Sequence, residues 1–312
     1  MKHAPVRHFV EYAAFSAVKA SLRLLPHQAA RGVGRAIGRL GHRVLGKHRR
    51  IALLNLEHAL PELSEAEREA IVRSCFEHFG LALCDTISAR RFGPVELCGR
   101  LELEGWENLQ EAEARAHERG VGTFLLTGHL GLWEMAAYAA GLYGGPIHVI
   151  ERPLDNPRLD RELARARRRF GNRLIPKRGA VRPMLRVMGD RGRIGILVDQ
   201  RAHPGEGIWV PFLGLEAYST PILARLSRRT GAPVVPMFGY PEPGGRYRVA
   251  VEPAIWAEEV AGLEGESAEV ELTRRHLEVI EKAVRRHPEM WLWMHDRWGL
   301  ARGSRRGEGA AG

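Results

Sequence analysis

The sequence predicts an α/β protein with a central, mainly parallel β-sheet flanked by helices, preceded by amphipathic helices at the N-terminus. Two observations predict this fold. From about residue 99, short apolar runs of β type alternate with helical stretches, as they do in sheets covered by helices on both faces. Before that point the chain has helical periodicity, and its first fifty residues carry the excess positive charge.

The location of that charge indicates the partners. Residues 1–50 hold 11 Lys and Arg against a single acid, Glu11, and the remaining residues balance at 36 basic and 36 acidic side chains. A local positive field is an argument about partners rather than fold. An anionic membrane surface is the expected partner. Nucleic acid is not expected, because no motif for reading it accompanies the charge.

Residues 1–50 are therefore predicted to form basic amphipathic helices at a membrane interface. Arginines four residues apart stack on one helix face, and an apolar stripe lies beside them; the two stripes are Arg31, Arg35, Arg39, Arg43 and Val33, Ile37, Leu40, Val44. Gly34 and Gly38 would allow close helix packing. Such a helix suits the headgroup layer, although a solvated basic face on a soluble helix explains the segment about as well. No apolar run is long enough for a conventional membrane span.

Residues 51–98 are predicted to be a helical hairpin packing on the main domain, with Ser64 and Glu67 as a capping box. The chain has three cysteines, without metal-type spacing or a redox motif, so buried, reduced thiols are expected. We expect no metal and no cofactor.

Residues 99–298 form the predicted α/β domain. Strands are expected at 121–127, 146–151, 193–199, 233–240 and 247–253, and helices at 131–142 and 156–170. A further helix should be capped by Thr220, start at Pro221 and end at Gly231. Residues 299–312 are low in complexity and are predicted to be a disordered tail.

The candidate catalytic residues are His129 and Glu134, in the stretch TFLLTGHLGLWEMAAYAAG. If His129 lies in the turn between strand and helix, its ring can fold back to Glu134, which would orient it as a general base. No G-x-S-x-G motif offers a protein nucleophile, so the base would activate a substrate hydroxyl. A structural histidine is the alternative.

The spacing alone is weak evidence, because His276 and Glu281 share it. That second pair lies in a continuous helical stretch, where five residues rotate by about 140°. Its side chains should diverge, and both are expected at the surface.

Asp199 and Gln200 directly follow the apolar run RIGILV of a predicted strand, at the carboxyl end where α/β sheets build sites. Asp199 is expected to support the site or contact substrate, with a loop-capping aspartate as the alternative. Three tryptophans near the C-terminus could line a lipid entrance, but core packing is the favoured interpretation: Trp291, Trp293 and Trp298.

Five collinear blocks resemble the bacterial late acyltransferases of lipid A biosynthesis, the lauroyl/myristoyl acyltransferase family with its His-x4-Asp/Glu signature. The blocks are HRRIALLNLEHALPELSEAERE, GHLGLWE, LDNPRLDRELARARRRFG, ILVDQR…VPFLG…STPILARLSRRTGAPVVP and HPEMWLWMHDRWG. The likeness extends to about residue 298. It implies a glycerol-phosphate-acyltransferase-like fold and a monotopic enzyme on the cytoplasmic face of the inner membrane.

The resemblance also implies the chemistry. A fatty acyl chain would pass from acyl carrier protein to a hydroxyl of a lipid A precursor, with His129 as base and Glu134 orienting it. Arg167 would bind phosphate or stabilise an oxyanion, and His295 with Arg297 matches a terminal family element. The same chemistry on another glycolipid, of phosphatidylinositol-mannoside type, or with acyl-CoA as donor remains the alternative.

Overall fold

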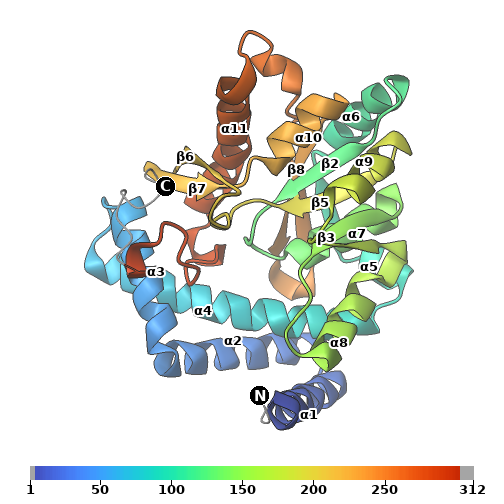
Figure 1. Ribbon diagram of the computed structural model, residues 1–312. Coiled ribbons are helices and arrows are strands. Elements are labelled where there is room, and N and C mark those ends of the chain that lie inside the picture. Colours follow the sequence, from blue (N-terminus) through green and yellow to red (C-terminus); the bar gives the residue numbers. More distant parts are fainter. Residues whose placement is uncertain (1–3, 303–312) are drawn as a thin grey trace.

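The computed structural model describes residues 4–302 and has the predicted α/β architecture, a mainly parallel central sheet with helices on both faces (Figure 1). The seven-stranded sheet has the order β1-β9-β8-β2-β5-β3-β4. Neighbouring strands pair in parallel, except β8 with β9, which are antiparallel. The strands are β1 (Leu101–Glu104), β2 (Thr123–Thr127), β3 (Ile147–Glu151), β4 (Arg173–Pro176), β5 (Arg193–Leu197), β8 (Val234–Pro241) and β9 (Tyr247–Val251). A separate hairpin joins β6 (Ile208–Phe212) to β7 (Leu215–Ser219).

The central strand β2 is apolar on both faces, as a parallel strand covered twice must be. Phe124 and Leu126 belong to one core, and Leu125 between them belongs to the other. The first core is closed by α9 (Val181–Gly189), α10 (Ile222–Thr230) and α11 (Gly265–Arg286). The second is closed by α6 (Trp106–Glu118) and α7 (Trp133–Gly144). Helices therefore pack on both faces of the sheet and hold the ends of its central strands in place.

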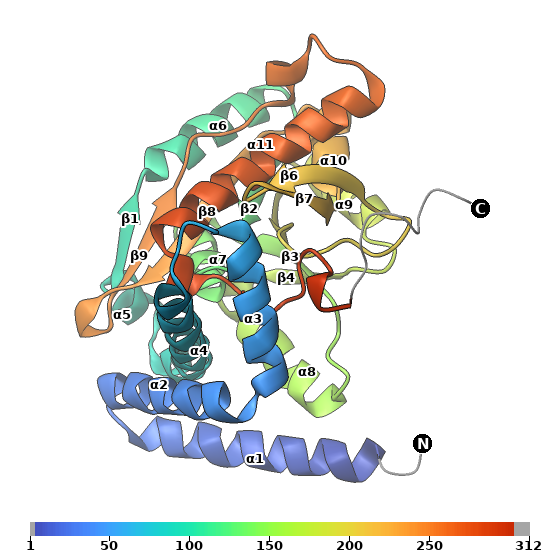
Figure 2. The ribbon, with the colours of Figure 1, turned by 90° about the vertical axis from the view of Figure 1, so that its left-hand side faces the viewer.

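Five α-helices precede the sheet in the described part of the chain: α1 (Ala4–Leu24), α2 (His27–Val44), α3 (Gly46–Ala59), α4 (Glu65–Ser88) and the short α5 (Pro94–Cys98). In both views α1 and α2 form the base of the molecule, α3 rises from α2, and α4 lies above α2 (Figures 1 and 2). The capping box of Ser64 and Glu67 is confirmed at the start of α4. Within residues 4–302, no helix combines the length and apolarity needed to cross a bilayer.

Glycines bring α2 and α4 into close contact, as their spacing predicted. A Cβ on Gly38 would lie 2.2 Å from the carbonyl oxygen of Phe76, and one on Gly34 would lie 2.6 Å from that of Gly80. The apolar stripe beside these glycines remains exposed: Val33, Ile37, Leu40 and Val44. The helix therefore packs through its glycine face and leaves its apolar stripe uncovered.

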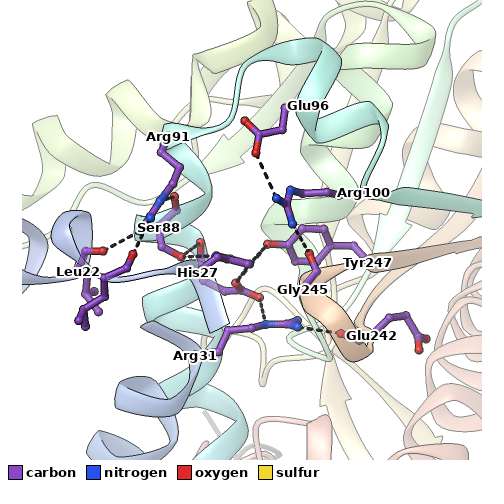
Figure 3. Close-up of polar contacts among 12 residues, drawn as sticks. Leu22, His27, Arg31, Ser88, Arg91, Glu96, Arg100, Glu242, Gly245 and Tyr247 are labelled. Atoms are coloured by element: carbon purple, nitrogen blue, oxygen red, sulfur yellow. Dashed lines mark hydrogen bonds and ion pairs between the residues drawn. The ribbon is translucent and has the colours of Figure 1, made fainter. Parts of the chain in front are cut away.

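A buried polar network fastens α2 to α4 and to β9 (Figure 3). His27 bonds Ser88 through Nδ1 at 3.0 Å, and its Nε2 lies 3.1 Å from Asp85 Oδ1. Tyr247 reaches both His27 and Asp85 with its hydroxyl. The arginine stripe therefore needs one correction. Arg31 is only 3% exposed and donates to Asp85 and to the carbonyl of Glu242, because its position faces α4 rather than solvent.

Several boundaries differ slightly from the predicted ones. Pro221, not Thr220, occupies the N-cap position of α10, without a side-chain cap hydrogen bond. Gly231 ends the helix as expected, in the left-handed conformation. The strands β1 and β4 and the β6–β7 hairpin were not predicted. Within the predicted tail, Leu300–Arg302 form a 3₁₀ turn, and residues 303–312 lie outside the described part.

Candidate active site

His129 and Asp199 are brought together by the register of two neighbouring strands. Thr127 is the last residue of β2 and pairs with Leu197, the last residue of β5. Each candidate lies two residues beyond its strand end. Because the strands are parallel, their carboxyl ends meet at the same edge of the sheet, and the two side chains face each other there.

Three hydrogen bonds hold the Asp199 carboxylate against this loop. Its Oδ1 lies 2.8 Å from His129 Nδ1, and its Oδ2 accepts from the His129 backbone N–H at 2.7 Å. The indole N–H of Trp291 donates to the same Oδ2 at 2.9 Å. A Cβ on Gly128 would lie 3.1 Å from Oδ2, so any side chain here would press on the carboxylate. These bonds hold the Asp199 carboxylate in one position, with the His129 ring against it.

Asp199 is an ionised carboxylate in an enclosed place, with 1% of its surface exposed. Burial by itself raises the pKa of Asp199, but the His129 ring and the donated hydrogen bonds outweigh it and lower the pKa to about 2. A buried anion in contact with Nδ1 selects the tautomer that carries its proton there. The other ring nitrogen, Nε2, is then left with its lone pair.

The ring of His129 is only partly buried, and the neighbour of its Nε2 is a neutral amide. The side chain is 24% exposed, and the amide nitrogen of Gln200 lies 3.3 Å from Nε2. Trp133 flanks the ring, with centroids 5.4 Å apart. The structure thus brings together three of the predicted site residues, namely His129, Asp199 and Gln200.

Glu134 and Arg167 form a separate pair. The guanidinium of Arg167, the last residue of α8 (Pro157–Arg167), forks onto the Glu134 carboxylate, with Nη2 2.6 Å from Oε1. Its Nη1 reaches Glu151 at 3.3 Å. One guanidinium therefore serves two carboxylates, and the group of three carries a net negative charge. This arrangement is unfavourable for binding a phosphate at Arg167.

The predicted hydrogen bond between His129 and Glu134 is therefore wrong: the carboxylate on the ring is Asp199. The physical reason lies in residues 130–132, which bond to distant segments of the chain. Leu130 forms an isolated bridge with Trp291, the N–H of Gly131 donates to Met290, and that of Leu132 donates to Gly239. These bonds to distant segments fix the path of the linker, in which Gly131 has a positive φ of 60°. The ring is thereby turned to Asp199 rather than to the first turn of α7.

The last part of the chain supports the same edge of the sheet. His295 accepts the backbone N–H of Arg201 at Nε2, at 3.1 Å, which fixes the turn that carries Asp199 and Gln200. Burial lowers the pKa of His295 and so favours this neutral acceptor form. Arg297 is fully buried and donates to the carbonyl of Tyr218 and to the Ser219 hydroxyl. The terminal pair thus ties the β6–β7 hairpin and the Asp199 loop together.

The tryptophans are core residues, as favoured: Trp291, Trp293 and Trp298 are 1%, 0% and 6% exposed. The bond from Trp291 to Asp199 was not predicted. Nor was His78 on α4, which donates to the carbonyl of Gly131 at 3.1 Å. Asn55 on α3 donates to the carbonyls of Trp293 and His295. None of these contacts has a local sequence signal, since each joins segments far apart in the chain.

The second histidine and glutamate with this spacing, His276 and Glu281, were both predicted to lie at the surface. His276 is 1% exposed, which corrects its predicted surface position. Leu272 and Ile280, four residues on either side, are fully buried, so His276 lies on the apolar face of α11. Glu281 accepts from the Leu213 backbone N–H and pairs with Arg285. Across residues 4–302, no three His, Cys, Asp or Glu side chains gather in a way that could hold a metal ion.

Comparison with known proteins now identifies the family. The family model described as bacterial lipid A biosynthesis acyltransferase matches residues 2–299. The chain belongs to this family. Lipid A biosynthesis lauroyltransferase of Escherichia coli K12 is 27% identical over 277 residues, covering 88% of this chain and 86% of that protein. The myristoyltransferase of the same organism is 28% identical over 262 residues, 84% of this chain and 77% of that protein. The family members are O-acyltransferases, and so is this chain.

Proposed function

We propose that this acyltransferase moves a fatty acyl chain from the thioester of acyl carrier protein to a hydroxyl of a lipid A precursor. The acceptor class is supported by the family and by relatives named for lipid A biosynthesis. The observation that carries the mechanism is the contact of His129 Nδ1 with Asp199, which leaves Nε2 of a partly exposed ring to act as the base.

The reaction follows from this geometry. Nε2 of His129 takes the proton of the acceptor hydroxyl as its oxygen attacks the thioester carbonyl. The tetrahedral intermediate collapses, the C–S bond breaks, and the imidazolium returns its proton to the leaving thiolate. Asp199 stabilises the imidazolium between the two steps, since its charge is buried 2.8 Å from the ring.

Two groups can stabilise the charge on the carbonyl oxygen. The amide of Gln200 lies beside Nε2, and α7 begins at Trp133 next to the His129 ring, so the positive end of its dipole lies near the site. Glu134 acts in this proposal through Arg167, by holding the guanidinium beside the first turn of α7.

The site of action is the cytoplasmic face of the inner membrane. Exposed apolar side chains on α1 and α2 support this, together with the arginines that accompany them: Val6, Phe9, Val10, Ile37, Leu40, Val44 and Arg35, Arg39, Arg43. A cationic, partly apolar surface favours anionic lipid, at about 1 kcal/mol for each Lys or Arg near the bilayer. The same charge would attract an acidic carrier protein.

The test is a transfer assay with the purified full chain. Acyl carrier protein thioester and a lipid A precursor should give an acylated product, and His129→Ala should lower kcat by roughly 10²–10⁴-fold. Acyl-CoA and a phosphatidylinositol mannoside, run in parallel, identify the donor and the acceptor. Full transfer by His129→Ala would defeat the mechanism, and no transfer to any of these acceptors would defeat the function.

A further inference from the structure

A cationic cavity lies between α1 and α8, away from the His129 loop. It has a volume of about 290 Å³ and is lined by Tyr12, Arg158, Arg161, Glu162 and Arg165. The two helices lie beside each other at the base of the molecule (Figure 1), joined by the ion pair of Lys19 with Glu162. The volume is at the small end of the range for ligand pockets.

The arginines of this cavity share one face of α8. Arg158, Arg161 and Arg165 are spaced by three and four residues, which stacks them along a helix. Arg167 lies on the same helix but turns to Glu134 and Glu151. The helix therefore directs one guanidinium toward Glu134 and Glu151 and three toward the cavity.

The cavity holds more positive than negative charge. Glu162 is the carboxylate in its lining, and it is already bonded to Lys19 at 2.5 Å, Arg165 at 3.1 Å and Arg90 at 3.2 Å. Arg158 lies over the rings of Phe9 and Tyr12, at 5.5 and 5.7 Å from their centroids. Among the described residues, neither Arg158 nor Arg161 forms an ion pair with a carboxylate. Their guanidinium donors are free for an anionic ligand.

We propose that this cavity binds a phosphate group on the headgroup of a membrane amphiphile. Guanidinium groups match phosphate oxygens in charge and in forked geometry. A concave lining favours a small anionic group over the broad surface of an acidic protein. The neighbouring turn of α1 exposes Val6, Phe9 and Val10 by 66%, 58% and 59%, so the ligand meets apolar side chains next to the arginines. That combination favours a lipid over free phosphate.

The position suits the acceptor of the proposed reaction, and this step rests on that proposed function. Arg161 precedes Arg167 by six residues, about 9 Å along the helix axis. Arg167 in turn contacts Glu134 in the first turn of α7, next to Trp133 on the His129 ring. A phosphate held at Arg161 would leave the acyl chains of the same molecule within reach of the base.

The test compares two double variants that remove the same charge. Arg161→Gln with Arg165→Gln alters the cavity, and Glu162 keeps Lys19 and Arg90. Arg182→Gln with Arg186→Gln on α9 is the control, since both are exposed and lie outside the cavity. Binding of the full chain is measured by co-sedimentation with phosphatidylcholine vesicles that contain phosphatidic acid. Circular dichroism and thermal melting check that each variant folds.

The cavity variant should bind these vesicles about tenfold more weakly or worse, and the control should bind like wild type. Arg161→Lys with Arg165→Lys should recover part of the loss, because lysine restores the positive charge but not the two parallel hydrogen bonds that a guanidinium can donate to phosphate. Equal losses in the two glutamine variants would overturn the proposal in favour of general surface charge. The proposal would also be overturned if the cavity variant bound acyl carrier protein more weakly but bound the vesicles as tightly as wild type does. It would be overturned too if the wild-type chain bound inorganic phosphate, without vesicles, as tightly as it binds the vesicles.

A kinetic arm separates this proposal from the proposed function. With wild type active, the cavity variant should raise the KM for a phosphorylated acceptor more than the KM for the same acceptor without phosphate. An equal KM change for both acceptors would contradict the cavity proposal and leave the acyl transfer intact. A wild-type chain that binds the vesicles as described but transfers no acyl group would defeat only the proposed function.

Discussion

The Nδ1 atom of His129 lies 2.8 Å from Oδ1 of Asp199, and the other oxygen of the same carboxylate accepts from the backbone N–H of His129. One acid thus fixes both the ring and the peptide that carries it. Trp291 anchors that acid from a third direction. The catalytic base is held by a group 70 positions away in the sequence, because β2 and β5 are neighbours in the sheet.

Asp199→Asn should lower kcat by roughly 10²–10⁴-fold with a small change in thermal stability. The amide is close in size to the carboxylate, and its oxygen can still accept from the His129 backbone and from Trp291. Its NH₂ group would face Nδ1 and favour the tautomer with the proton on Nε2, which cannot act as base. Asp155→Asn, at a side chain 82% exposed, is the control. If Asp199→Asn retained wild-type kcat, the carboxylate would be structural.

The sequence predicts where the strands before His129 and Asp199 end, but it does not predict that these two strands are neighbours in the sheet. His129 and Asp199 could each be placed just beyond a strand from the apolar runs before them, whereas their contact depends on strand order, which no local pattern encodes. Glu134 was assigned to the ring because it is close in sequence, whereas backbone bonds to Met290 and Gly239 set the path of the linker between them. The burial of His276 was readable from Leu272 and Ile280, each four residues away. The close packing at the glycines of α2 could be predicted, because their four-residue spacing places them on one face of a single helix.

Glu134 and Arg167 should act as one unit. Glu134→Gln frees a guanidinium next to Glu151, and Arg167→Gln leaves two carboxylates facing each other, so each single variant should lose activity. The double variant should be no worse than the worse single one, with a coupling of roughly 0.5–3 kcal/mol in kcat/KM. The four proteins are compared in one transfer assay. Additive losses would mean that Glu134 acts independently of Arg167.

His78 should make the protein less stable in acid. Burial lowers the pKa of His78 to about 4, although its bond to Gly131 opposes the shift. Below the unfolded value of about 6.5 the unfolded chain takes up a proton that the folded state refuses, so stability falls as pH falls toward 4. Relative to His78→Gln, which can keep the bond through its amide, wild type should lose about 2 kcal/mol more between pH 7 and pH 5. Urea unfolding at both values measures this, and a constant difference between the proteins would contradict it.

Gly38→Ala should loosen the docking of α2 on α4. The new methyl group would lie 2.2 Å from the carbonyl oxygen of Phe76, a backbone atom that cannot move without shifting a helix. Such overpacking costs roughly 1–3 kcal/mol, which exceeds the gain of up to about 1 kcal/mol that alanine brings to a helix. Gly32→Ala on the same helix is the matched control, because nothing lies within 4 Å of its Cβ position, so it should be neutral or stabilising. Urea unfolding of the two variants decides: equal stabilities would mean that α2 can move away from α4 without loss, and the N-terminal helices would then be only loosely joined to the catalytic domain.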